Sequence, residues 1–229
     1  MGSTFGFSTR ILTTVTSFFC ITMPSTPDRT AHAREQFERE GVPVTWVYGI
    51  DAISFAIKPA LYMHTNTPDG SGYFISPGAC ALVLSHYMAF RFAERDGAED
   101  FVIFEDDVIL PENFLTKLEA IKREVPQDCL AIWLEYCCCD PSRMEKVTAN
   151  LRRALPMCTA AVWYRKEALP IVFEAIQPAH APVDILLKHR AKLNQCVVDP
   201  QMCFQVKYND TVNSTIHRVM PTEPKECIA

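Results

Sequence analysis

The sequence predicts an α/β protein in which a mostly parallel sheet, flanked by helices, forms a single domain. Residues 16–23 and 42–48 are rich in β-branched and aromatic side chains, as buried strands are, and residues 31–40 between them are dense in helix formers. This strand–helix–strand order indicates a βαβ unit, and such a unit implies parallel strands joined by a right-handed crossover. Residues 101–104 are all apolar and are therefore expected to form a central strand.

The other elements follow from the same patterns. Residues 52–78 show weak periodicity and carry prolines and glycines, so we expect a long loop. Apolar side chains at helical spacing predict a helix over 78–95. Pro111 is a favourable start for a helix over 111–124, and Pro182 with Asp184 for another over 182–193. We also expect strands at 129–134 and 159–164, a loop at 137–153, a helix at 167–175, and short strands near 197–198 and 203–206.

Composition and charge narrow the class of protein. Of the 229 residues, 48% are hydrophobic and 21% charged, as in globular proteins, and the net charge of −5 provides no broad basic field for nucleic acid. No run of about 20 apolar residues is present to span a bilayer. The ten cysteines show no Cys-x-x-Cys or zinc-finger spacing, and several lie in apolar runs. We therefore expect reduced thiols and a cytoplasmic location.

The strongest chemical signal is the acidic triplet Glu105-Asp106-Asp107, which directly follows the central strand. Ligands of open α/β sheets bind at the carboxyl ends of the strands. Three adjacent carboxylates repel one another, so a cation or strong donors are expected nearby, and oxygen ligands suit Mg²⁺ or Mn²⁺. The alternative is an acidic first turn of the next helix, but Pro111 is a better start for that helix.

Other polar residues are expected near the same edge of the sheet. Arg29, in the Pro24–Arg29 segment after the first strand, could grip a diphosphate through its rigid fork of donors, or simply begin a helix in solvent. Asp51 ends the second strand. His86, next to Ser85, is either a site residue or a core histidine, and Asp184 is either a general base or a helix cap.

The chain resembles glycosyltransferase family 25, the lipooligosaccharide and collagen-galactosyl type. The matching stretches are MPSTPDRTAHAREQFEREGVPVTWVYGIDA, SPGACALVLSHYMAFRFAERDGAEDFVIFEDDVILPENF, TAAVWYRKEALP and PVDILL, with a weaker match at FQVKYNDTVNST. They occur in family order across about 16–216, and the block from Ser85-His86 to the acidic triplet is the specific part. We therefore expect a transferase domain at 16–216, an N-terminal extension at 1–15 and a C-terminal tail at 217–229.

The resemblance implies a GT-A-like, Rossmann-type fold and a nucleotide-diphosphate sugar donor, a UDP-sugar in the first instance. A hexose such as galactose or glucose would pass to a hydroxyl of a glycan or protein, with inversion and with Mn²⁺ or Mg²⁺ as cofactor. By this resemblance Asp107 and Glu105 hold the metal, and Asp184 is the catalytic base. The donor-binding residues are then Pro24, Asp28, Arg29, Asp51, Ser85, His86, Glu105 and Asp106.

The chain departs from the family pattern in two places. Ser76-Pro-Gly-Ala-Cys80 replaces the usual Gly-Glu-Ile-Gly-Cys, which removes a carboxylate, and the Cys137-Cys-Cys-Asp140 loop is unlike the family sequence. Three other functions stay open at this stage. They are a transferase acting on hydroxymethylated bases in DNA, a catalytically silent binding module and a metal-dependent hydrolase.

Overall fold

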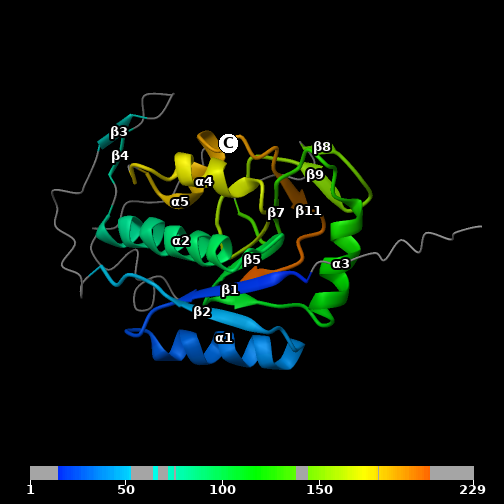
Figure 1. Ribbon diagram of the computed structural model, residues 1–229, viewed down its shortest axis with the longest axis horizontal. Coiled ribbons are helices and arrows are strands. Elements are labelled where there is room, and N and C mark those ends of the chain that lie inside the picture. Colours follow the sequence, from blue (N-terminus) through cyan, green and yellow to red (C-terminus); the bar gives the residue numbers. More distant parts are fainter. Residues whose placement is uncertain are drawn as a thin grey trace, which may run out of the picture.

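The computed structural model describes residues 15–52, 64–66, 72–74, 76–137, 144–179 and 181–206 (Figure 1). The strands are β1 (Ser17–Thr22), β2 (Val44–Tyr48), β3 (His64–Asn66), β4 (Gly72–Phe74), β5 (Asp100–Glu105), β6 (Val108–Ile109), β7 (Ala131–Trp133), β8 (Glu145–Lys146), β9 (Leu151–Arg153), β10 (Ala161–Arg165), β11 (Cys196–Val198) and β12 (Phe204–Gln205). The helices are α1 (Pro27–Glu40), α2 (Pro77–Arg95), α3 (Phe114–Glu124), α4 (Ala168–Ala175) and α5 (Val183–His189).

Eight of these strands form one mixed sheet, in the order β2-β1-β5-β10-β7-β11-β9-β8. β1 pairs in parallel with both β2 and β5, as the βαβ pattern predicts. β10 is antiparallel to both β5 and β7, so β5 and β7 run in the same direction. The carboxyl ends of β1, β2, β5 and β7 therefore share one edge of the sheet with the start of β10. We call this edge the carboxyl edge.

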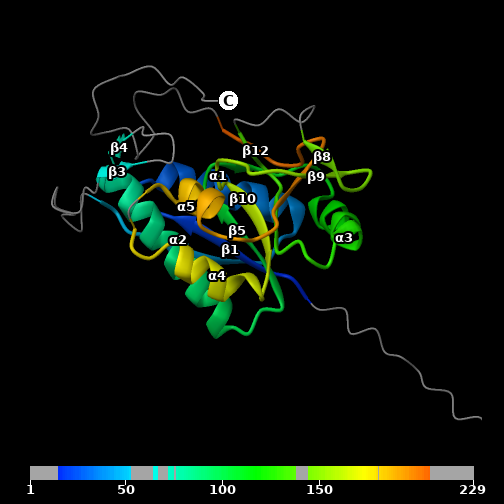
Figure 2. The same cartoon turned by 90° about the horizontal axis from the view of Figure 1, so that it is seen from above.

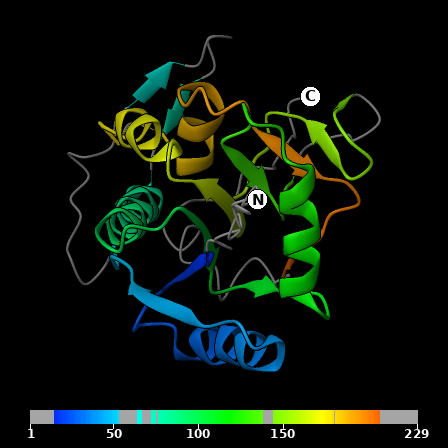
Figure 3. The ribbon, with the colours of Figure 1, turned by 45° about the vertical axis from the view of Figure 1, so that its right-hand side comes forward.

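Helices cover both faces of the sheet, which confirms the predicted α/β architecture. One apolar cluster joins one face to α2, α4 and α5, and a second joins the other face to α1 and α3. Figure 3 shows the sheet between these two groups of helices. In Figure 2, α2 lies beside α4, and ring contacts such as that between Tyr87 and Phe173 join the two helices.

Local signals in the sequence account for several of the boundaries. Pro27 stands in the first turn of α1, and Gly41 ends that helix at a φ of 63°, a left-handed conformation that glycine adopts without strain. The hydroxyl of Ser76 caps α2 by accepting a hydrogen bond from the Ala79 N–H at 3.1 Å, and Pro77 follows in the first turn.

Some boundaries differ from the prediction. α3 begins at Phe114 and not at Pro111, because Asn113 before it adopts a left-handed φ of 57° that interrupts the helix. α5 ends at His189, before the predicted 193. The predicted loop 137–153 contains β8 and β9, which pair at the sheet margin. Of the predicted loop 52–78, the structure describes residues 52, 64–66, 72–74 and 76–78, and within it β3 and β4 pair as antiparallel strands. The N-terminal extension, apart from residue 15, and the C-terminal tail lie outside the described residues.

The prediction of reduced cysteines is wrong for one pair. An isolated bridge between Cys137 and Met157 brings the Cys137 and Cys158 Cα atoms to 5.7 Å, and the two form a disulfide. Disulfides persist mainly in oxidising compartments, so this pair does not support the cytoplasmic location predicted from reduced thiols. The described cysteines outside that pair are all buried: Cys20, Cys80, Cys129, Cys196 and Cys203. Within the described residues no helix is both long and apolar enough to cross a membrane.

Candidate active site

Glu105 and Asp106 point to opposite faces of the sheet, because successive side chains of a strand alternate between its two faces. Phe101 and Ile103 of β5 pack into the cluster with α2, whereas Val102 and Phe104 pack into the cluster with α1. The alternation extends to Glu105 and Asp106, whereas Asp107 lies in the turn after β5 and pairs with Arg29 as Asp106 does. Glu105 accepts a hydrogen bond on the α2 side, and Asp106 pairs with α1.

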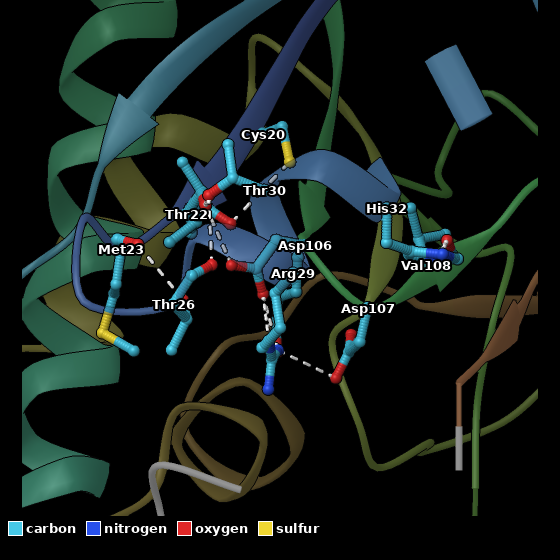
Figure 4. A network of polar contacts seen from close by, with 12 residues as sticks. Cys20, Thr22, Met23, Thr26, Arg29, Thr30, His32, Asp106, Asp107 and Val108 are labelled. Atoms are coloured by element: carbon cyan, nitrogen blue, oxygen red, sulfur yellow. Dashed lines mark hydrogen bonds and ion pairs between the residues drawn. The ribbon is translucent and has the colours of Figure 1, made fainter. Parts of the chain in front are cut away.

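Arg29 of α1 joins the last two carboxylates of the triplet (Figure 4). Its Nε donates to Asp106 Oδ1 at 2.7 Å, and its Nη2 donates to Asp107 Oδ2 at 3.0 Å. Thr22, at the end of β1, donates from Oγ1 to Asp106 Oδ2 at 2.9 Å. Both oxygens of Asp106 are thus engaged, whereas Asp107 Oδ1 is buried and has no hydrogen-bond partner.

Glu105 is held on the opposite face. Its Oε1 lies 3.2 Å from His86 Nε2 and accepts a hydrogen bond from Thr159 Oγ1 at 2.6 Å. Burial alone raises the pKa of Glu105, but the His86 and Thr159 hydrogen bonds and the charge of Arg29 outweigh it and lower the pKa below its ordinary value. Glu105 therefore carries a stable negative charge inside the site.

Burial and the charges of neighbouring carboxylates raise the pKa values of Asp106 and Asp107. Burial, together with the charge of Glu105, raises the pKa of Asp107 to about 7 although Arg29 opposes the shift. Burial also raises the pKa of Asp106, against the opposing effects of Arg29 and Thr22. This part of the carboxyl edge is rich in negative charge that the protein's own cations offset only in part.

Two further carboxyls lie beyond β10. Glu135 lies two residues after the end of β7 and is 3% exposed, and its Oε2 has no hydrogen-bond partner. Burial and then the charges of Glu105 and Asp107 raise its pKa to about 8. Asp184, in the first turn of α5, accepts hydrogen bonds from the Ile185 N–H at 2.8 Å and the Cys158 N–H at 3.4 Å.

The remaining predicted residues lie on the side of β1 and β2. Pro24 and Asp28 are exposed before and within the first turn of α1, and Asp51 is half-buried after β2. The Ser85 hydroxyl accepts from the Ile50 N–H at 2.9 Å and donates to the Ala81 carbonyl at 2.7 Å, so it anchors the end of β2 to α2.

Three residues at the carboxyl edge were not predicted from the sequence: Thr22, Thr159 and Glu135. Thr22 and Glu135 stand at or just after predicted strands, so the rule that identified the acidic triplet could have found them. Thr159 precedes β10, which runs antiparallel to β5, and no sequence signal indicated that direction.

The donor atoms present fit a divalent cation bound together with a substrate. No group of three potential ligands stands ready to hold a metal ion among the residues that the structure describes. Mg²⁺ and similar ions, however, are often held by only one or two carboxylates, with substrate phosphates and water completing the coordination. Asp107 Oδ1, buried and without a partner, is an oxygen of the required kind.

The raised pKa values predict an unusual pH dependence of stability in EDTA. The folded-state pKa is about 7 for Asp107 and about 8 for Glu135, against ordinary values of 3.8 and 4.5. At pH values between the ordinary and the folded pKa, the native state binds more protons than the unfolded state. The free energy of unfolding therefore falls as the pH rises through this window. Carboxyls with lowered pKa values, such as Glu105, lose their stabilising effect only below about pH 4.5, close to the ordinary value.

We expect the Tm to decline from pH 5 to pH 8, as measured by circular dichroism. Glu135→Gln should flatten the decline and raise the Tm at pH 8 by roughly 2–4 °C, the shift that 1 kcal/mol produces at this size. A Tm that rises over this range, or an unchanged slope in the variant, would contradict this account.

The chain is similar to one protein family and to several solved structures. The family model for glycosyltransferase family 25 (LPS biosynthesis protein) matches residues 15–156, and no curated protein matches significantly. A glycosyltransferase involved in the glycosylation of the major capsid of PBCV-1 is 11% identical, with a TM-score of 0.49 over 84% of this chain and 94% of that one. A197 from STIV is 12% identical, with a TM-score of 0.45 over 80% of each chain.

The glycosyltransferase GlyE of Streptococcus pneumoniae TIGR4 is 7% identical, with a TM-score of 0.46 over 86% of this chain and 55% of that one. The family assignment rests on the sequence model, which spans more than half of the chain. The fold is the predicted single-domain α/β fold, with helices on both faces of one sheet. The chain belongs to glycosyltransferase family 25 and is a glycosyltransferase.

Proposed function

We propose that this glycosyltransferase transfers a hexose from a nucleotide-diphosphate sugar to a hydroxyl of a glycan or protein. The expected donor is a UDP-sugar, the expected cofactor is Mn²⁺ or Mg²⁺, and the anomeric configuration is expected to invert. The observation that carries the proposal is the pairing of Arg29 with Asp106 and Asp107 at the carboxyl edge. The Arg29 guanidinium can bind phosphate oxygens, and the neighbouring carboxylates, whose charge it neutralises only in part, can bind a divalent cation. A metal–diphosphate complex requires both kinds of group.

On the donor side, the nucleotide would lie along the ends of β1 and β2, near Asp51 and the start of α1. Arg29 would turn from the carboxylates to the diphosphate, because a guanidinium binds phosphate oxygens through two parallel N–H bonds. Thr22 would keep Asp106 in place during this exchange through the hydrogen bond that it already donates.

Asp107 is the expected metal ligand, through the oxygen that has no hydrogen-bond partner. When bound, a divalent cation would neutralise the negative charge that builds on the departing diphosphate. Glu105, fixed by His86 and Thr159, would act from the opposite face, and its charge strengthens the attraction of the site for cations.

The sugar would then point toward β10 and β7, where the attacking hydroxyl must approach. Inversion requires a single displacement, in which the hydroxyl oxygen bonds to the anomeric carbon as the bond to the diphosphate breaks. A carboxylate on this side would accept the hydroxyl proton. Asp184 is the candidate that the sequence suggests, and Glu135 is the other carboxylate on this side.

The proposal is tested by a thermal-shift panel of UDP-, GDP- and CMP-sugars with and without Mn²⁺. A ligand that binds only the native state stabilises it by mass action, so at a concentration 100 times its Kd the true donor adds about 2.7 kcal/mol. We expect one nucleotide class, UDP in the first instance, to raise the Tm only when Mn²⁺ is present.

The matched control is the same panel on Asp107→Asn, for which the Mn²⁺-dependent part of the shift should disappear. If no nucleotide sugar shifts the Tm with metal, or if the variant responds as the wild type does, the proposed donor site is wrong.

A further inference from the structure

Glu135 is a buried carboxyl whose environment a purely structural role does not explain. It lies two residues after the end of β7 at the carboxyl edge and is 3% exposed. The Ala160 N–H hydrogen-bonds to the carboxyl and orients it. The other oxygen, Oε2, is buried without a hydrogen-bond partner. Buried polar atoms are rarely left unpaired, so such an oxygen is a sign of a group kept for a substrate.

Asp184, in contrast, has a hydrogen bond at each carboxylate oxygen. Its Oδ1 accepts from the Ile185 N–H and its Oδ2 accepts from the Cys158 N–H, so both oxygens are engaged by the backbone. These bonds tie the first turn of α5 to the segment that carries the Cys137–Cys158 disulfide. The carboxyl of Asp184 thus has a structural function that proton transfer would disturb, whereas Glu135 Oε2 has none.

The position of Glu135 also suits the reaction. β5 and β7 run in the same direction on the two sides of β10, so Glu135 and the acidic triplet face the same edge across the start of β10. The charge of Glu135 interacts with those of Glu105 and Asp107, which places the three groups in one electrostatic environment. A sugar whose diphosphate lies at Asp107 would extend toward Glu135.

Resting on the proposed function, we infer that Glu135, and not Asp184, is the catalytic base of the transfer. The acceptor hydroxyl oxygen forms its bond to the anomeric carbon, and its proton passes to Glu135 Oε2. The bond from the anomeric carbon to the diphosphate breaks, and the nucleoside diphosphate leaves with the electron pair. The proton is then released to solvent, so the products are the glycoside, the nucleoside diphosphate and one proton.

The test compares Glu135→Gln with Asp184→Asn. UDP release from UDP-galactose and UDP-glucose is measured with Mn²⁺, using water, free galactose, glucose or N-acetylglucosamine as the nucleophile. A parallel series uses azide, an anionic nucleophile that has no proton to lose. The glutamine keeps the shape of the side chain and removes a buried charge, so this variant should fold.

We expect Glu135→Gln to lower kcat with hydroxyl nucleophiles by about 10²- to 10⁴-fold, the usual contribution of a general base. The donor KM should change by less than about threefold, the acid limb of the kcat–pH profile should disappear, and azide-dependent UDP release should match the wild type. Asp184→Asn should lower the Tm and reduce kcat by less than about tenfold, because it weakens backbone contacts without removing the base.

Several results would overturn the inference while leaving the donor site intact. They are a Glu135→Gln kcat within about threefold of wild type, an equal loss with azide and with hydroxyls, or a larger loss in Asp184→Asn. A wild type that binds the donor but turns it over with none of these nucleophiles also counts against it, because such a base should activate water. If the wild type neither binds nor turns over any nucleotide sugar, the proposed function fails as well.

Discussion

Replacing Asp107 by asparagine is expected to lower Mn²⁺-dependent transfer by about 10³-fold, a loss of roughly 4 kcal/mol of transition-state stabilisation. Asp107 offers a buried oxygen without a hydrogen-bond partner beside a cationic fork, and an amide in its place has no charge with which to bind a divalent cation. The measurement is kcat/KM for UDP release from the donor identified by thermal shift, across a titration of Mn²⁺.

The control for this change is Asp128→Asn. Asp128 also forms an ion pair with an arginine, Arg153, but its side chain is 56% exposed and lies away from the carboxyl edge. Its kcat/KM should stay within about twofold of wild type, since exposed ion pairs contribute little. An Asp107→Asn variant that keeps a tenth or more of the activity, with unchanged Mn²⁺ dependence, would show that Asp107 is not the metal ligand.

The second large effect is expected at Arg29. Arg29→Ala should lower kcat/KM by about 10²- to 10³-fold, because it removes the donors that stabilise the leaving diphosphate. It should also destabilise the protein by about 3–5 kcal/mol, because Asp106 and Asp107 lose their cation in a largely buried site. Arg29→Lys should recover much of the stability and little of the activity, since an ammonium lacks the planar fork.

Arg34→Ala serves as the matched control for Arg29. Arg34 stands on the same helix, but its guanidinium lies over the Trp46 ring, 5.2 Å from the ring centroid, and it is exposed. Both kcat/KM and the Tm should change little. If Arg29→Lys proves as active as wild type, the fork geometry plays no part in the reaction, and a simple positive charge is sufficient.

The fold was largely predictable because its signals are local. The βαβ unit was readable from apolar strands, helix formers and the ends marked by Pro27 and Gly41. The antiparallel direction of β10 was not, because apolar residues in a buried strand carry no information on direction. The left-handed Asn113 that delays α3 and the Cys137–Cys158 disulfide both depend on neighbours that the chain brings together only on folding.

The site shows the same division between local and long-range information. The strand-end rule located the acidic triplet, and Arg29 was expected beside it. The alternation of side chains along the strand, which is itself readable from sequence, directs Glu105 to His86 and Asp106 to Arg29. Thr159 and Glu135 reach the site only because β10 lies next to β5 in the sheet and β7 lies next to β10, and no sequence motif encodes that order.

The most direct measurement of the central claim is anomalous scattering from crystals grown with Mn²⁺ and UDP. We predict one strong peak beside Asp107 Oδ1, at a coordinating distance of roughly 2 Å, with the Arg29 guanidinium moved onto the diphosphate. A complex in which UDP binds while Mn²⁺ lies elsewhere, and Arg29 remains paired with Asp106 and Asp107, would contradict it.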